Sequence, residues 1–201
     1  MVMKSFKLFF LGLLASVSFL KASIETGATA PDFTLKDTTG TTHSLSDFDG
    51  MFVVLEWTND QCPFVVKHYS QGDMQATQKM LTDEGVVWLQ IVSSAPGKQG
   101  HLSAAEGETL RKELKMHSTA LLLDENGNVG KAYDAQKTPH MYVIDPKGIL
   151  IYQGAIDSVR STRQSDISNA NNYVVSAYKS AKAGKPIKNA TTVAYGCGIK
   201  Y

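Results

Sequence analysis

The sequence has few cysteines, almost no net charge and only one long apolar run. Its two cysteines, Cys62 and Cys197, allow one disulfide within the chain, which a domain of this length does not need in order to fold. The formal net charge of +1 gives no indication of nucleic acid or of an anionic membrane surface as a partner. No internal repeat or low-complexity tract is present. The remaining composition, 43% hydrophobic and 19% charged, is ordinary for a soluble globular protein.

The apolar run lies at the N-terminus. Lys4 and Lys7 precede residues 8–20, a run too short to span a bilayer comfortably, and Ala22 supplies a small residue for cleavage. We therefore predict a secretory signal peptide over residues 1–22, with an uncleaved anchor as the alternative. Export predicts a secreted or periplasmic protein in an oxidising compartment, with no membrane attachment after signal cleavage.

Alternating and apolar segments predict the secondary structure of the mature chain. A β-hairpin is expected over residues 30–45, and further strands at 51–55, 86–92, 119–123, 141–145 and 149–154. Helices are expected at 62–69, 74–81, 103–117, 129–133 and 166–181. This order predicts an α/β domain over residues 28–184, with one central mixed sheet, helices on both faces and an N-terminal β-hairpin extension. Residues 185–201 form a C-terminal tail that carries Cys197.

Cys62 stands where a buried strand is expected to give way to a helix. The apolar run of residues 51–55 leads through a polar turn to Cys62, and Pro63 fits the first helical position, which needs no amide donor. Free backbone N–H groups and the helix dipole favour the thiolate there, and the thiolate is the nucleophilic form of cysteine. We therefore hypothesise a redox cysteine, with a buried inert cysteine as the alternative.

The neighbours of this cysteine are assigned by position. Residues 59–61 are polar and indicate an exposed thiol. Glu56, near the end of the strand, is either a buried proton acceptor or a residue hydrogen-bonded at the strand end. Trp57 is expected to pack beside the site. Lys67 is expected to be solvated, and His68 to be at or near the surface.

The second cysteine has two interpretations that the sequence does not separate. Cys197 lies between Gly196 and Gly198, and a flexible tail would allow its thiol to resolve a sulfenic acid on Cys62. The alternative is a static bridge between tail and core, which would stabilise the fold by ~4–5 kcal/mol. A disulfide between two chains is a third arrangement.

Four stretches carry a resemblance to a known family: residues 56–69, Thr138-Pro139 before a strand, residues 145–148 and residues 196–201. On these stretches the chain resembles the peroxiredoxin-like redoxins of the thioredoxin superfamily, the alkyl hydroperoxide reductase and thiol-specific antioxidant group. The resemblance covers residues 28–201. It implies a thioredoxin-like fold, Cys62 as the reactive cysteine, and Pro139 as a cis-proline packed beside it. If that loop packs there, His140 also approaches Cys62, and an imidazolium would lower the pKa of the thiol.

The chain departs from the family at Asn59. Thioredoxins place their first cysteine at that position when Cys62 is taken as the second, and peroxiredoxins place threonine or serine there. No local cysteine pair exists in the sequence. No arginine can be assigned to polarise a peroxide, the candidates being Arg111, Arg160 and Arg163. Any redox cycle is therefore expected to close through Cys197 or an outside thiol.

These observations predict an exported, antioxidant thiol oxidoreductase. Cys62 would reduce a small peroxide or a disulfide, an external thiol would supply electrons, and no organic cofactor would be needed. A thiol–disulfide oxidoreductase without peroxidase activity is the first alternative. A copper-binding module with Cys62 and His140 as ligands is another, and a structural protein with an inert Cys62–Cys197 bridge is the last.

Overall fold

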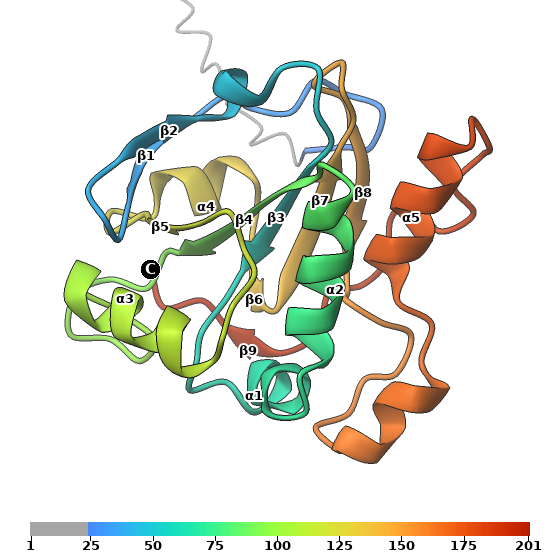
Figure 1. Ribbon diagram of the computed structural model, residues 1–201. Coiled ribbons are helices and arrows are strands. Elements are labelled where there is room, and N and C mark those ends of the chain that lie inside the picture. Colours follow the sequence, from blue (N-terminus) through green and yellow to red (C-terminus); the bar gives the residue numbers. More distant parts are fainter. Residues whose placement is uncertain (1–23) are drawn as a thin grey trace, which may run out of the picture.

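A computed structural model describes residues 24–201, so the predicted signal peptide over residues 1–22 lies outside the described residues. One seven-stranded sheet has the order β2-β1-β5-β4-β3-β7-β8 (Figure 1). Its strands are β1 (Thr34–Asp37), β2 (Thr42–Ser44), β3 (Val53–Trp57), β4 (Val87–Val92), β5 (Ala120–Leu123), β7 (His140–Ile144) and β8 (Leu150–Gly154). Strands β3, β4 and β5 are parallel, and the other pairs are antiparallel. The mixed sheet confirms the predicted α/β architecture.

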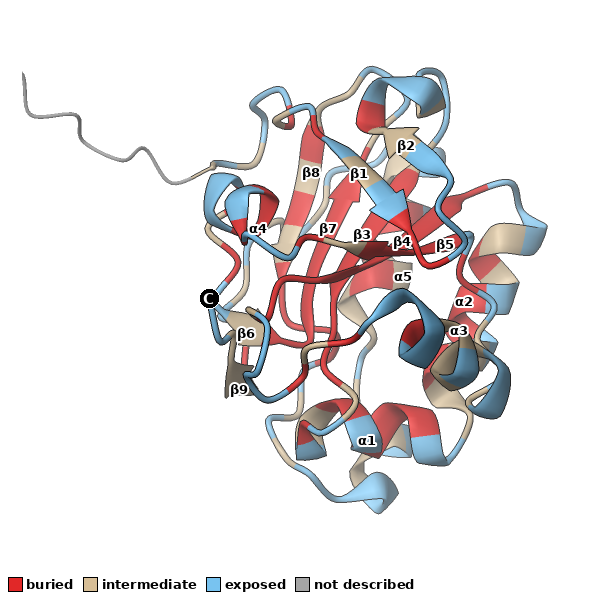
Figure 2. Cartoon of the chain, turned by 90° about the vertical axis from the view of Figure 1, so that its left-hand side faces the viewer, coloured by how far each residue is buried: buried red, intermediate tan, exposed pale blue. Residues whose placement is uncertain are grey.

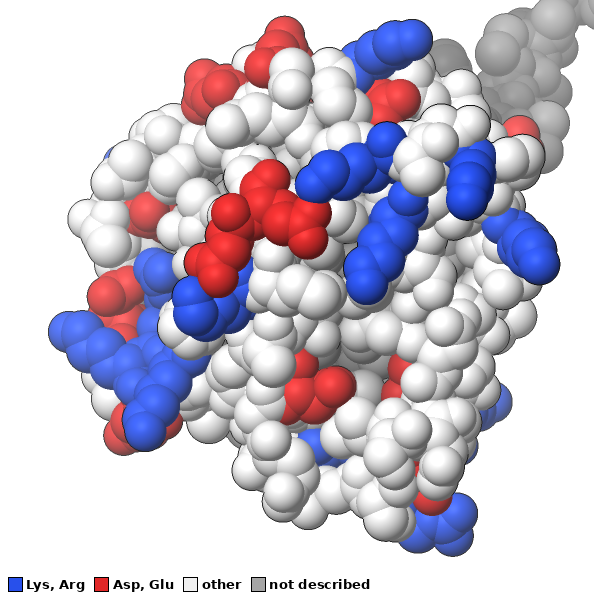
Figure 3. All heavy atoms as spheres, turned by 45° about the vertical axis from the view of Figure 1, so that its right-hand side comes forward, with Lys and Arg blue, Asp and Glu red and all other residues white. Residues whose placement is uncertain are grey.

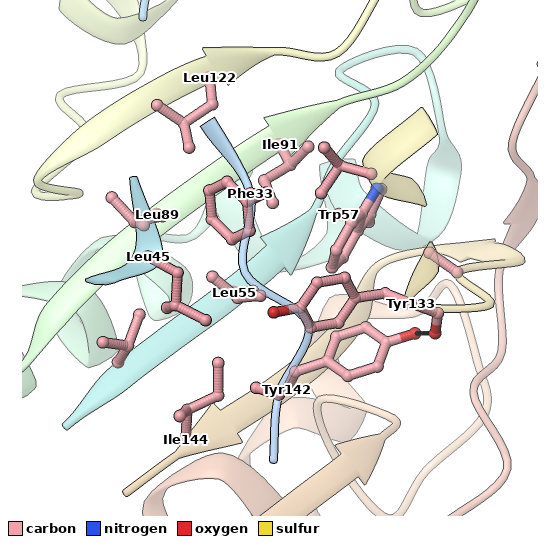
Figure 4. Close-up of a cluster of buried hydrophobic side chains, with 14 of the residues drawn as sticks. Phe33, Leu45, Leu55, Trp57, Leu89, Ile91, Leu122, Tyr133, Tyr142 and Ile144 are labelled. Atoms are coloured by element: carbon pink, nitrogen blue, oxygen red, sulfur yellow. Dashed lines mark hydrogen bonds between the residues drawn. The ribbon is translucent and has the colours of Figure 1, made fainter. Parts of the chain in front are cut away.

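Helices cover both faces of this sheet, as predicted. They are α1 (Pro63–Ser70), α2 (Asp73–Asp83), α3 (Ala104–Glu113), α4 (Asn128–Ala132) and α5 (Tyr173–Lys182), with 3₁₀ turns at Leu45–Phe48 and Gln164–Asn169. Buried residues of α1, α2 and α5 form one apolar cluster on one face. The other face is covered by α4 and the N-terminal hairpin region, whose cluster is shown in Figure 4.

Two predicted helix boundaries are wrong. Asp166 was expected to begin a long helix, but the chain becomes extended at Ala170, and α5 begins only after Asn172. The Asn172 side chain caps α5 by accepting a hydrogen bond from the Val175 N–H at 3.0 Å. Helix α3 ends at Glu113 rather than near residue 117. Lys115, two residues after this end, takes a positive φ of 49°, which does not fit a right-handed helix.

The C-terminal tail lies along the domain. Its Thr192 N–H donates to Gln153 at 3.0 Å, and the Lys200 carbonyl accepts from the Ala95 N–H at 2.8 Å. Between these contacts, β9 (Cys197–Gly198) pairs antiparallel with β6 (Lys137–Thr138), and Figure 2 shows the two strands side by side. Cys197 is therefore held against the domain, contrary to the expectation of a flexible tail.

The described surface carries charges of both signs. On the face shown in Figure 3, basic and acidic side chains are interspersed rather than gathered by sign. Within residues 24–201, no helix combines the length and the apolar character needed to cross a bilayer.

Candidate active site

Cys62 sits at the junction of β3 and α1, as the sequence predicts. It is the N-cap residue of α1, and Pro63 occupies the first turn. Its carbonyl accepts from the N–H groups of Val65 and Val66, both at 2.9 Å. Its side chain, however, is 0% exposed, so the prediction of an exposed thiol is wrong. The polar residues before Cys62 turn the chain, and other segments cover the sulfur.

The segment that packs on the sulfur is the Thr138-Pro139 loop. The Thr138–Pro139 peptide bond is cis, as the family resemblance implied. The Cys62 thiol donates to the Thr138 carbonyl at 3.0 Å. The hydroxyl of Thr138 is buried and has no hydrogen-bond partner. A donor beside the sulfur thus remains free for a thiolate to accept from.

Cys197 reaches the same sulfur through the backbone pairing of the tail. Thr138 pairs with Cys197 in the β6–β9 ladder, and the Cys197 N–H donates to Cys62 Sγ at 3.4 Å. Both residues are free thiols, with Cys62 buried and Cys197 half-buried. Although 135 positions separate them in the chain, the two cysteines form a local pair in space.

The two thiols differ in acidity. Burial raises the pKa of Cys62, but hydrogen bonds from Cys197 and Thr138 and from backbone N–H groups stabilise the thiolate, and the pKa is lowered overall. Burial and the neighbouring Cys62 sulfur raise the pKa of Cys197 to about 11. Of the two thiols, Cys62 is therefore the more acidic.

Asn59 shapes the turn before Cys62. Its side chain is 1% exposed and accepts from the Gln61 N–H at 2.9 Å, while its carbonyl accepts from the Cys62 N–H at 3.0 Å. Gly100 packs so closely on the Asn59 side chain that a Cβ would overlap it. Asn59 thus fixes the position of Cys62 rather than facing an open site.

Glu56 lies in the core on the α1 side of β3. Its carboxylate accepts from Tyr69 at 2.7 Å, Trp88 at 2.8 Å and Gln78 at 3.2 Å, and the residue is 0% exposed. Burial raises the pKa of Glu56 in spite of these hydrogen bonds. Glu56 is therefore a buried acid whose three hydrogen-bond partners are core side chains rather than Cys62.

Trp57 and His140 face the other side of the sheet. They are register partners on β3 and β7, and Trp57 packs against Tyr133 and Tyr142, which also contact each other (Figure 4). The His140 ring lies 3.2 Å from the Tyr142 hydroxyl, and burial lowers its pKa to about 4. His140 is therefore neutral near pH 7 and supplies no imidazolium to Cys62. Trp57 likewise packs in the opposite cluster.

Lys67 and His68 are buried, which sequence reasoning missed. Both are 1% exposed, and Lys67 Nζ lies 3.0 Å from a carboxylate oxygen of Asp157. His68 Nδ1 lies 2.7 Å from Asp73. Helix α1 is short, and the Asp157 loop and the tail residue Tyr195 cover its outer side. No local pattern in the sequence signals that cover, because its parts lie far along the chain.

A cleft of about 570 Å³ opens between the N-terminal residues 24–26, the segment before β7 and the C-terminal tail. Its walls include Lys137, His140 and residues 191–194. Neither Cys62 nor Cys197 lines this cleft. Within residues 24–201, no group of three or more His, Cys, Asp or Glu side chains is arranged to hold a metal ion.

Comparison with known proteins gives one family and a set of similar folds. The model of the AhpC/TSA family matches residues 26–153. A hypothetical protein from Sinorhizobium meliloti 1021 is 25% identical, with 90% of this chain and 96% of that chain covered and a TM-score of 0.73. An uncharacterized conserved protein from Geobacillus kaustophilus is 25% identical, with coverages of 88% and 92% and a TM-score of 0.76.

The thioredoxin domain of a thiol-disulfide oxidoreductase from Bacteroides vulgatus shares the fold. It is 20% identical, with 73% of this chain and 98% of that chain covered and a TM-score of 0.53. Among curated proteins, no significant match was found.

Proposed function

The chain belongs to the AhpC/TSA family, and we propose that it is a thiol oxidoreductase in which Cys62 attacks the substrate and Cys197 resolves the product. Its fold is that of a redoxin of the thioredoxin superfamily. One observation carries the proposal: the Cys197 N–H lies 3.4 Å from Cys62 Sγ. With the Cys197 backbone in contact with Cys62 Sγ and both thiols free, the pair can cycle between a dithiol and a disulfide. Sulfur carries both electrons, so the cycle needs no organic cofactor.

A disulfide is the substrate class that the site favours. The Cys62 thiolate attacks one sulfur of a substrate disulfide, a mixed disulfide forms, and the other substrate sulfur leaves as a thiolate. Cys197 then loses its proton and attacks Cys62 Sγ. This forms the Cys62–Cys197 disulfide and releases the second substrate thiol. Two electrons pass to the substrate, and an external thiol donor restores the pair.

Peroxide is the second substrate class, and the family match is the observation in its favour. Attack of the Cys62 thiolate on one peroxide oxygen breaks the O–O bond and gives a sulfenic acid, while the other oxygen leaves as hydroxide or alkoxide and takes up a proton. Cys197 then attacks Cys62 Sγ, which forms the disulfide and releases the sulfenic oxygen as water. Two of the candidate arginines are bound elsewhere, Arg111 to Glu108 and Arg163 to Asp166. With no guanidinium assigned to the peroxide, we expect peroxide to react more slowly than a disulfide.

Export and an antioxidant role belong to the same proposal. The apolar run over residues 8–20 supports cleavage after Ala22, and an oxidising compartment would keep the substrate disulfides formed. Cell fractionation with N-terminal sequencing tests this. The expected product is a chain shortened at its N-terminus in the periplasm or medium, and full-length chain confined to the cytoplasm would contradict it.

Turnover of the purified protein tests the chemistry. The reduced mature chain is mixed with excess glutathione disulfide or with hydrogen peroxide, and thiol loss is followed with time. Cys62→Ser should abolish both reactions, because the variant lacks the nucleophile. Full thiol-dependent turnover by Cys62→Ser would refute the proposal. Reaction with peroxide alone would reassign the substrate class.

A further inference from the structure

Lys67 and Asp157 form a buried ion pair that the proposed chemistry does not use. Their side chains are 0% and 4% exposed, and Lys67 Nζ lies 3.0 Å from Asp157 Oδ2. Nζ also donates to the Val159 carbonyl at 3.3 Å, and His68 Nε2 lies 3.6 Å from Asp157 Oδ2. Removing two charges from water costs free energy that their attraction offsets only when their remaining hydrogen-bonding positions are filled. Oδ1 of Asp157 accepts from the Val159 N–H at 2.9 Å and can accept from a second donor.

Tyr195 in the C-terminal tail supplies that donor. Its hydroxyl donates to Asp157 Oδ1, and the residue is 5% exposed. Its ring lies 5.6 Å from the ring of Phe64, centroid to centroid, and 6.0 Å from Lys67 Nζ. Phe64 and Lys67 both belong to α1, the helix that Cys62 begins. The tail is thus attached to the same helix that positions the reactive sulfur.

A single residue links this attachment point to Cys197. Gly196 has a φ of +136°, and a Cβ at this position would overlap the Thr138 carbonyl. The chain can therefore pass from Tyr195 straight into the Thr138–Cys197 pairing of β6 and β9. With one residue between them, the placement of the Tyr195 ring restricts where the Cys197 thiol lies.

We propose that Tyr195, held by Asp157 and Lys67, is a positioning residue that keeps Cys197 at Cys62. The role depends on the proposed function, because it concerns the step in which Cys197 attacks. In that step an S–S bond forms between the two cysteines, the bond from Cys62 to the substrate sulfur breaks, and the substrate thiolate takes up a proton. Holding the attacking sulfur nearby raises its effective concentration, whereas a released tail must first return.

Tyr195→Phe tests the proposal, because it removes one hydroxyl and keeps the ring. The matched control is Tyr178→Phe in α5, since the Tyr178 hydroxyl also donates to a carboxylate, that of Glu84 at 2.9 Å, and the residue is 2% exposed. Reduced proteins are treated with iodoacetamide, and alkylation of Cys62 is followed by mass spectrometry. Tyr195→Phe should raise the rate about ten- to hundredfold, the equilibrium effect of losing one hydrogen bond to a charged group. Tyr178→Phe should stay within about twofold of wild type.

A second measurement separates this role from the proposed function. Each protein is equilibrated in glutathione redox buffers, and the fraction with the Cys62–Cys197 disulfide is determined. Tyr195→Phe should need a more oxidising buffer, because its reduced form gains the released tail as an additional state. Wild-type alkylation and redox behaviour in Tyr195→Phe would overturn the proposal, as would equal changes in Tyr178→Phe. If wild type forms no such disulfide, the proposed function fails, while the alkylation rates still decide whether Tyr195 holds the tail.

Discussion

Replacing Gly196 by alanine is expected to lift the tail from Cys62 while the domain stays folded. The φ of Gly196 is +136°, a conformation that an L-residue rarely adopts. A Cβ there would overlap the carbonyl group of Thr138 and lie 3.3 Å from Pro139 N. These are backbone atoms, which cannot relieve the overlap by a change of rotamer as a flexible side chain can. The variant relieves the clash only by separating β9 from β6.

The size of the effect follows from the backbone conformation. A non-glycine residue held in such a region costs about 1–3 kcal/mol, and the overlap with Thr138 adds to that. The docked tail should therefore become less populated by a factor of about five to 150 or more. Cys62 is 0% exposed when the tail is docked, so its alkylation should accelerate by the same factor when docking equilibrates faster than alkylation.

Gly198→Ala is the matched control on the other side of Cys197. A Cβ on Gly198 would have its nearest neighbour, the Gln136 carbonyl oxygen, at 4.0 Å. We expect its Cys62 alkylation rate to stay within about twofold of wild type. Iodoacetamide alkylation of the reduced proteins, resolved by peptide mass spectrometry, gives both rates. Equal rates for Gly196→Ala and wild type would show that docking of the tail does not depend on the close approach at Gly196.

Three further predictions concern a buried ion pair, the resolving cysteine and a titrating carboxylate. Lys67→Met should lower the free energy of unfolding, measured by urea titration, by about 3–5 kcal/mol, because a buried carboxylate loses its partner. The control Lys79→Met, at an exposed ion pair, should change this free energy by less than about 0.5 kcal/mol. Cys197→Ser should stop at a mixed disulfide of Cys62 with glutathione in intact mass spectra, and wild-type release of glutathione would exclude Cys197 as the resolving thiol. Burial raises the pKa of Asp37, but hydrogen bonds outweigh burial and lower it to about 2. The stability that the ionised Asp37 carboxylate contributes is thus present above the ordinary pKa of an aspartate and is lost as the pH falls toward about 2. Asp37→Asn should destabilise the protein near neutral pH and not at about pH 2, and a pH-independent loss would contradict this.

Features set by neighbouring residues were predictable from the sequence. The helix start at Cys62-Pro63 and the capping box of Ser103 with Glu106 both appear where expected. Each depends on side chains and backbone groups within one turn, so the sequence contains the whole interaction. The cis bond at Pro139 came from the family resemblance, since the residues alone favour trans.

Burial around α1 was not predictable, because its cause is distant in the chain. Lys67 is a common surface residue type, and it is buried only because Asp157 and Tyr195 surround its ammonium group. The exposure of Cys62 was predicted wrongly for the same reason. The polar turn before it indicates a surface thiol, but the segment carrying Cys197 closes over the sulfur. The pattern of side chains along one helix does not show which distant segments of the chain will bury it.

The start of α5 shows a different limit. Apolar spacing continues back through Ile167, and Asp166 is a residue type that often caps helices. The chain instead forms a 3₁₀ turn and an extended residue at Ala170 before Asn172 caps the helix. Asp157 pairs with Asn172 in an isolated β-bridge at this point, a tertiary contact that overrides the local periodicity.

The position of the disulfide in the oxidised protein tests most directly whether Cys62 and Cys197 form a local, redox-active pair. The reduced mature chain is oxidised with glutathione disulfide and digested without reductant, and its cross-linked peptides are identified by mass spectrometry. We predict a bond between Cys62 and Cys197 within one chain, reversible by reduced glutathione. Two cysteines that stay free, a link found only between chains, or a bond that thiols do not reduce would contradict a local, redox-active pair.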